Sequence, residues 1–144
     1  MPEKRTRARA HRDARQGKSG STQAGEFVRA EMEHMREGKH GARSSKQAIA
    51  IGLSRARRAG VKVPARGSPR TRRKAAQDSR RGRSHRRTSS RRSRATASAL
   101  KREGHRSTSH KSLSRQSHSA ALKRSSRSRS AASRKAARTR ALRK

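Results

Sequence analysis

The sequence has no cysteine, tryptophan or tyrosine, and its only aromatic residue is Phe27. Without cysteine, neither a disulfide framework nor a cysteine-based zinc site can hold the chain together. Without aromatic platforms, base stacking of the kind used by RNA-binding sheets and oligonucleotide-binding barrels is excluded. No long apolar run is present either, since residues 48–53 are too few to span a bilayer and no signal-peptide core follows the basic N-terminus. These absences predict a cytoplasmic protein that does not enter membranes.

Acidic residues are also scarce, because eight Asp and Glu stand against 44 Lys and Arg and the net charge is +36. Residues 65–144 hold 28 of these cations, two acids and only four large aliphatic side chains, all leucine. A chain with this much like charge and so little to bury repels itself until polyanions neutralise it. The abundant polyanions of a cell are DNA and RNA. The composition therefore predicts a nucleic-acid partner and a chain that is mostly disordered, with one small all-α element.

Three segments follow from the shifts in composition. Residues 1–20 are predicted to form a disordered basic arm, and residues 21–64 a helical hairpin domain. Residues 65–144 are predicted to form a disordered, low-complexity tail rich in Arg, Ser and Ala. The boundary lies where Pro64, Gly67 and Pro69 discourage a continuing helix.

The second helix of the hairpin is predicted at about residues 45–59. Ser44 and Gln47 have the spacing of a capping box, and Gly60 followed by Val61 is typical of a Schellman close. Small residues lie along one edge of the helix, where Gly52 would let another helix approach, whereas Ser54 is placed on the solvent side.

The first helix is predicted at about residues 23–37, with Gly38 as its stop. Glu31 falls inside its apolar arc, so we expect a cation from the second helix or from a partner chain to meet it. Two helices alone cannot bury all the apolar side chains, so we expect marginal stability that self-association through the hairpin or bound nucleic acid would improve. The residues predicted to pack the two helices are Phe27, Val28, Met32, Met35, Ile49, Gly52, Leu53 and Ala56.

The segment from Gly25 to Gly60 carries the pattern K-Q-A-I-A-I-x-L-S-x-A-R-x-A-G over residues 46–60. It resembles a domain of small, basic, uncharacterised bacterial proteins, and the likeness covers about 40 residues. The resemblance implies a bacterial, cytoplasmic protein and gives no catalytic residue. The tail is similar to linker-histone tails and protamines in composition only.

Clusters of arginine and lysine are the strongest functional signal, since each cation held near a phosphate releases a condensed counterion whatever the base sequence. Arginine outnumbers lysine 33 to 11, which favours bidentate phosphate contacts. The predicted nucleic-acid-binding residues are Arg55, Arg57, Arg58, Arg72, Arg73, Lys74, Arg80, Arg81, Arg83, Arg86, Arg87, Arg91, Arg92, Arg94, Arg134 and Lys135.

Catalytic and metal-binding motifs are weak. Glu31 and His34 have the Glu-x-x-His spacing of metal-binding helix bundles, but such a site needs a second pair and further carboxylates. The remaining histidines lack ligand spacing, and no scaffold fixes a nucleophile beside a base. The sequence therefore predicts no enzyme activity, no metal, no cofactor and no small-molecule substrate.

The favoured function is sequence-independent DNA binding and compaction by a histone-like protein associated with the bacterial nucleoid. RNA is the alternative ligand, in a ribonucleoprotein whose grooves the basic segments would fill. A third hypothesis is an adaptor whose hairpin binds a protein while the tail tethers that protein to nucleic acid. The acidic residues Glu26, Glu33 and Glu37 favour this third hypothesis. A helix-turn-helix that reads bases with residues 45–59 is disfavoured because its cations do not form one compact face.

Overall fold

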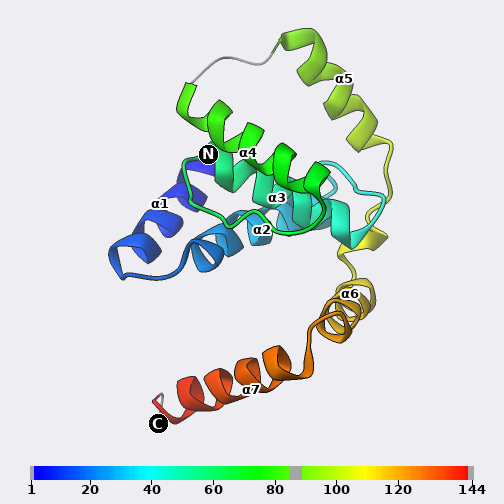
Figure 1. The fold of residues 1–144 in the computed structure, drawn as a ribbon. Coiled ribbons are helices and arrows are strands. Elements are labelled where there is room, and N and C mark those ends of the chain that lie inside the picture. The colour runs from blue at the N-terminus through cyan, green and yellow to red at the C-terminus, as the bar shows by residue number, and fades with distance from the viewer. Residues whose placement is uncertain (1, 85–88, 143–144) are drawn as a thin grey trace. The chain divides into compact units, whose positions relative to one another are not determined.

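The structure is a computed structural model that describes residues 2–84 and 89–142 (Figure 1). These residues form seven α-helices and one 3-10 helix, and none of the helices is long and apolar enough to cross a membrane. Residues 1–109 and 110–144 form two units, each with its own internal contacts. The elements are α1 Pro2–Arg15, α2 Gly20–Arg36, α3 Ser45–Arg58, α4 Pro69–Ser84, α5 Ser90–Lys101, η1 Arg106–Thr108, α6 His110–Leu122 and α7 Ser126–Ala141.

The prediction of a mostly disordered chain is wrong. Both the basic arm and the basic tail contain helices, and α1 and α4 pack directly on the hairpin that α2 and α3 form. The prediction was wrong because large apolar side chains are not the only residues that hold these helices together. The observed contacts use alanine, glycine, serine and threonine, which bring backbones close and bury area that such a count leaves out.

The helix signals at the hairpin correspond to real caps. The Ser44 hydroxyl accepts a hydrogen bond from the Gln47 amide at 3.3 Å and begins α3. At the other end Gly60 has φ +92°, and the Val61 amide donates to the Ala56 carbonyl at 3.0 Å, which confirms the Schellman close. The first helix begins earlier than expected, because Ser19 caps it and α2 starts at Gly20.

The interface between α2 and α3 depends on a close backbone approach. A Cβ atom at Gly52 would lie 2.6 Å from the Cα atom of Val28, so only glycine fits this crossing. Around it Phe27, Met32, Met35 and Ala56 are buried, while the side chains of Val28, Ile49 and Leu53 are partly buried. The small-residue edge of α3 therefore lies against α2.

Helix α1 packs against α2 of the hairpin. Its inward stripe is Thr6, Ala10 and Asp13, which are buried and recur at helical spacing. Ala10 joins Ala24, Phe27 and Ala56 in one apolar cluster. Helix α1 on α2, and α4 on α3, thus add cover to the hairpin within the same chain.

A segment far along the chain closes the other end of the hairpin. The Gly41 amide donates to the Leu100 carbonyl at 2.9 Å, and the Ala42 amide donates to the Gly104 carbonyl at 3.1 Å. The buried Ser45 hydroxyl donates to the Ser107 carbonyl at 2.6 Å. A side chain at Gly41 would collide with the Glu103 carbonyl, so the loop after α2 is shaped to receive residues 100–108.

The second unit contains α6 and α7, and none of their described residues is buried. Ser125 caps α7 by accepting a hydrogen bond from the Ser128 amide at 3.3 Å. Alanine and arginine are strong helix formers, so this helix follows from local preference and its cap rather than from a core.

Replacing Gly52 with alanine tests the close approach. We expect Gly52→Ala to destabilise the protein by about 1–3 kcal/mol, because the added Cβ meets backbone that cannot move independently. Gly25→Ala in α2 is the matched control, since nothing lies within 4 Å of the new Cβ. It should leave stability unchanged or raise it by about 0.4–1 kcal/mol. Thermal unfolding followed by circular dichroism measures both, and equal midpoints would show that this crossing is not tight.

Candidate nucleic-acid interface

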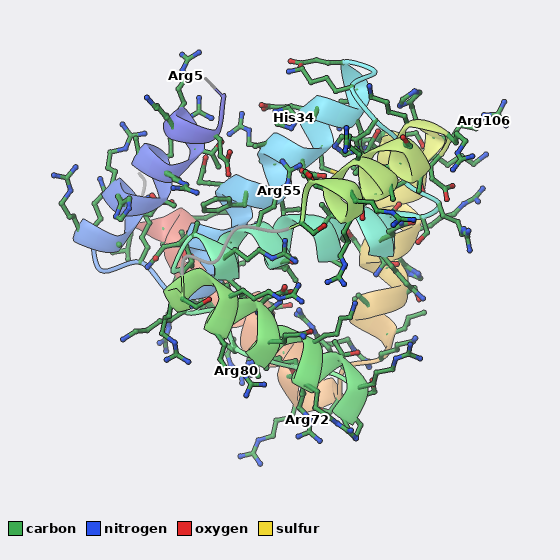
Figure 2. The ribbon with its side chains drawn as sticks, turned by 90° about the horizontal axis from the view of Figure 1, so that it is seen from above. Arg5, His34, Arg55, Arg72, Arg80 and Arg106 are labelled. Carbon is green, nitrogen blue, oxygen red and sulfur yellow. The ribbon has the colours of Figure 1, made fainter. Side chains whose placement is uncertain are left out.

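Helix α4 separates its small residues from its cations. Ala75, Asp78, Ser79 and Gly82 turn inward against α3 at i, i+3, i+4 and i+7 spacing. The opposite side of α4 carries five exposed cations, which we call the α4 basic face: Arg70, Arg73, Lys74, Arg80 and Arg81. In Figure 2 the side chain of Arg80 extends outward from the helix.

Two contacts fix α4 on α3. A Cβ at Gly82 would lie 2.7 Å from the Arg58 carbonyl oxygen, so α4 approaches the end of α3 closely. Asp78 accepts hydrogen bonds at Oδ1 from Arg58 Nε and Nη2, at 3.1 and 3.0 Å. Its Oδ2 accepts one from the Ser54 hydroxyl at 2.8 Å. Ser54 is therefore covered by α4. The expectation that Ser54 faces solvent is wrong, because no helix was expected at the position of α4.

The three arginines near the end of α3 have partners inside the chain. Arg55 Nη1 lies 2.9 Å from Glu31 Oε2, which confirms the expectation that a cation of the second helix meets this buried acid. Arg57 Nη2 donates to the Pro64 carbonyl at 3.4 Å, and Arg58 is held by Asp78. These guanidinium groups stabilise the first unit, so they are less available to phosphate than was expected from the sequence.

The other predicted binding residues that the structure describes lie on three helices of the two units. Those of α4 and α5 have exposed side chains, as do Arg134 and Lys135 of α7. Arg86 and Arg87 lie outside the described residues. By helix, the members are Arg72, Arg73, Lys74, Arg80, Arg81 and Arg83 on α4, and Arg91, Arg92 and Arg94 on α5.

Every acidic residue of the chain has a basic partner within 4.0 Å. Three of these pairs, those of Glu3, Glu33 and Glu37, are exposed on both sides and contribute little to stability, but together the eight pairs leave no patch of unpaired carboxylates on the described surface. Beside Glu37, the hydrogen bond and charge of Lys39 lower the pKa of the carboxyl. The pairs are Glu3–Arg7, Asp13–Lys18, Glu26–Arg9, Glu31–Arg55, Glu33–Arg29, Glu37–Lys39, Asp78–Arg58 and Glu103–Arg43.

Residues 3–67 match the model of a family of unknown function, DUF6496. The match spans α1, α2 and α3 and ends before α4, so it covers the helices that bury the apolar cluster and leaves out the α4 basic face. No curated protein and no solved structure matches the chain. The likeness is therefore to an uncharacterised family, and it assigns no activity to any residue.

Replacing Asp78 with asparagine tests how α4 is held. We expect Asp78→Asn to destabilise the protein by about 1–2 kcal/mol, because it removes the charge that Arg58 and Ser54 contact. The rate of amide hydrogen exchange should increase more in α4 than in α2. Glu3→Gln is the control, since its pair with Arg7 is exposed and should contribute almost nothing. Unchanged exchange in α4 would mean that Gly82 and Ala75 alone hold the helix.

Proposed function

We propose that this protein binds nucleic acid without sequence preference and compacts DNA as a histone-like component of the bacterial nucleoid. The α4 basic face makes the first contact with phosphates, and the exposed cations of α5 and, in the second unit, of α7 add further phosphate contacts. Affinity comes from release of condensed counterions, which does not depend on the bases.

The observation that carries this proposal is the arrangement of the α4 basic face. From Arg70 to Arg81 the helix rises by about 16 Å, at about 1.5 Å per residue. One DNA strand presents a phosphate about every 3.4 Å along the axis, so this face spans about five phosphates. Five exposed cations over that length match the charge density of one strand.

The internal pairing of acids supports the same function. Glu26, Glu33 and Glu37, which favoured an adaptor that binds a protein partner, each have a cation of this chain beside them. They neither repel phosphate strongly nor present an unpaired acidic surface to a basic protein. DNA binding is therefore preferred to the adaptor function. RNA is the alternative ligand, and the experiment below compares the two.

Binding to DNA should be steeply salt-dependent and nearly indifferent to sequence. If about ten phosphates are neutralised, log affinity should fall with log salt at a slope near −9. The measurement is a titration of the full chain against two unrelated duplexes of equal length, and against an RNA duplex, at several salt concentrations. A shallow slope, or more than about tenfold discrimination between the DNA duplexes, would indicate base contacts and overturn the proposal. Marked preference for the RNA duplex would transfer the function to RNA.

A second test asks whether the α4 basic face matters beyond its charge. The variant Arg73→Gln, Arg80→Gln, Arg81→Gln should reduce the magnitude of the salt slope by about 3, at about 0.9 per phosphate contact. The control Arg9→Gln, Arg29→Gln, Lys39→Gln removes the same charge, but from cations that already have carboxylate partners. We expect the control to keep a slope close to that of the unmodified protein. Equal losses would show that net charge alone governs binding.

A further inference from the structure

Glu31 is a fully buried carboxylate in a chain that is otherwise rich in cations. It projects from α2 toward the loop that follows this helix and toward α3. Its Oε2 lies 2.9 Å from Arg55 Nη1, and its Oε1 lies 3.1 Å from His40 Nε2. These are charge contacts without hydrogen-bond geometry, so neither carboxylate oxygen has a hydrogen-bond partner. A buried carboxylate held in this way keeps a strong affinity for a cation placed on its lone pairs.

The backbone of the next residue, Gly41, orients the His40 ring toward Glu31. Its Nδ1 lies 3.3 Å from the Gly41 carbonyl oxygen, an acceptor that fixes Nδ1 as the protonated nitrogen. The Nε2 atom then faces Glu31 Oε1 with a lone pair, and it too is buried without a hydrogen-bond partner. Two lone pairs at 3.1 Å repel each other unless a cation lies between them. Donation of the second ring nitrogen to a backbone carbonyl is the usual support of a metal-bound histidine.

His34 completes the cluster from the next turn of α2. Its ring lies edge-on to that of His40, with centroids 6.5 Å apart and planes at 75°. One ligand atom each from Glu31, His34 and His40 lies within 4.8 Å of the others. Ligands of a tetrahedral zinc ion are about 3.4 Å apart when each bond is about 2.1 Å. The Glu31 and His40 atoms, 3.1 Å apart, are close to that spacing, and the His34 ligand atom lies within 4.8 Å of both.

We propose that Glu31, His34 and His40 form a binding site for a divalent transition-metal ion, with Zn²⁺ as the favoured occupant. Two imidazoles and one carboxylate are a donor set that zinc accepts, and they leave a fourth position for water. Arg55 stays on Oε2 as the outer partner of the ligating carboxylate while Oε1 faces the ion. The site is separate from the α4 basic face, and its existence does not depend on nucleic-acid binding.

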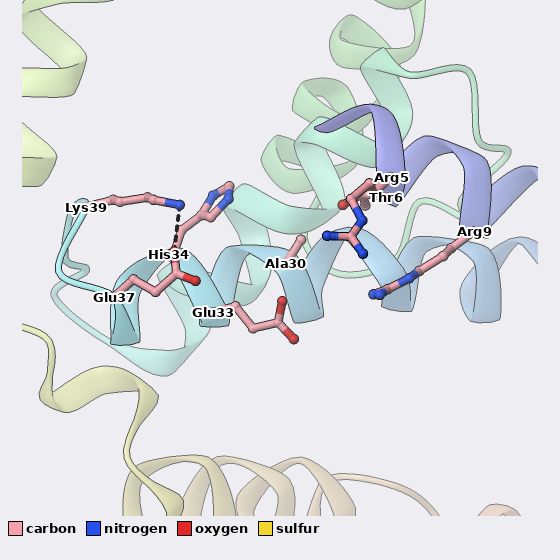
Figure 3. A pocket seen from close by; sticks show the side chains of 8 residues that line it. All are labelled: Arg5, Thr6, Arg9, Ala30, Glu33, His34, Glu37 and Lys39. Carbon is pink, nitrogen blue, oxygen red and sulfur yellow. Dashed lines mark ion pairs between the residues drawn. The ribbon is translucent and has the colours of Figure 1, made fainter. Parts of the chain in front are cut away.

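One member of the cluster, His34, lies at the surface. A depression between α1 and α2 is lined by eight residues that include His34, Glu37 and Lys39 (Figure 3). His34 is partly exposed along this depression, while Glu31 is covered from solvent. A hydrated ion would therefore meet His34 before it meets the buried carboxylate.

Occupancy of the site would stabilise the fold. His40 lies in the loop whose next two residues bind the segment around Leu100 and Gly104. A metal bond from α2 to His40 would hold this loop in the conformation that receives residues 100–108. Metal binding is thus coupled to folding, and the unfolding temperature reports it.

The experiment uses the full chain, stripped of metal with a chelator, and adds Zn²⁺ or Co²⁺. We expect one ion per chain by calorimetry, a rise of several degrees in the unfolding midpoint, and a tetrahedral Co²⁺ absorption spectrum. The variant His34→Ala, His40→Ala should lose more than about 100-fold in affinity, beyond the 10–100-fold typical of an outer partner. The matched control is His105→Ala, His118→Ala, which removes two exposed histidines elsewhere. It should bind as the unmodified protein does.

Two results would overturn the proposal. Absence of a saturable stoichiometric site in the unmodified chain would leave a proton as the only cation between His40 and Glu31. Equal binding by both double variants would place the metal on other histidines. Circular dichroism of each variant without metal shows whether it folds, and single variants at His34 or His40 replace the double variant if it does not.

Discussion

The close crossing of α2 and α3 is the constraint on which the rest of the first unit depends. Because Gly52 carries no side chain, the backbone of α3 reaches that of α2 at Val28. That distance lets Arg55 reach Glu31, and it brings the loop carrying His40 over the same carboxylate. A wider crossing would leave a buried negative charge without its cation, which costs several kcal/mol (order of magnitude) in a protein interior.

Helix α3 links the two functional proposals without making them one. On one side its Arg55 faces Glu31 and the proposed metal site, and on the other its Arg58 and Ser54 hold Asp78 of α4. The α4 basic face depends on the second contact, because Asp78 and Gly82 determine which side of α4 turns away from α3. The proposed metal site and the α4 basic face therefore lie on different sides of α3.

The distribution of charge explains why the helices of so basic a chain can pack together. Their cations do not repel one another strongly where the helices are in contact. All eight acidic residues lie beside cations of the same chain, and the buried ones, Asp13 and Glu31, lie where helices meet. The inward faces of α1 and α4 carry small residues and acids, whereas their arginines point outward. Repulsion among those outward groups is weakened by water and salt, and polyanions remove it.

The sequence by itself determined the local structure of the hairpin, because capping depends on neighbouring residues: Ser44 with Gln47, and Gly60 with Val61, were readable in advance. It also determined the net charge and predicted that a cation, from the second helix or from a partner chain, would meet Glu31. Only the tertiary structure decided that the arm and tail are helical, that Ser54 is covered by α4, and that His40 joins Glu31 and His34. Those outcomes depend on how closely small residues let two helices approach each other. This closeness is set by both packing surfaces together, which are distant in the sequence, so composition alone does not reveal it.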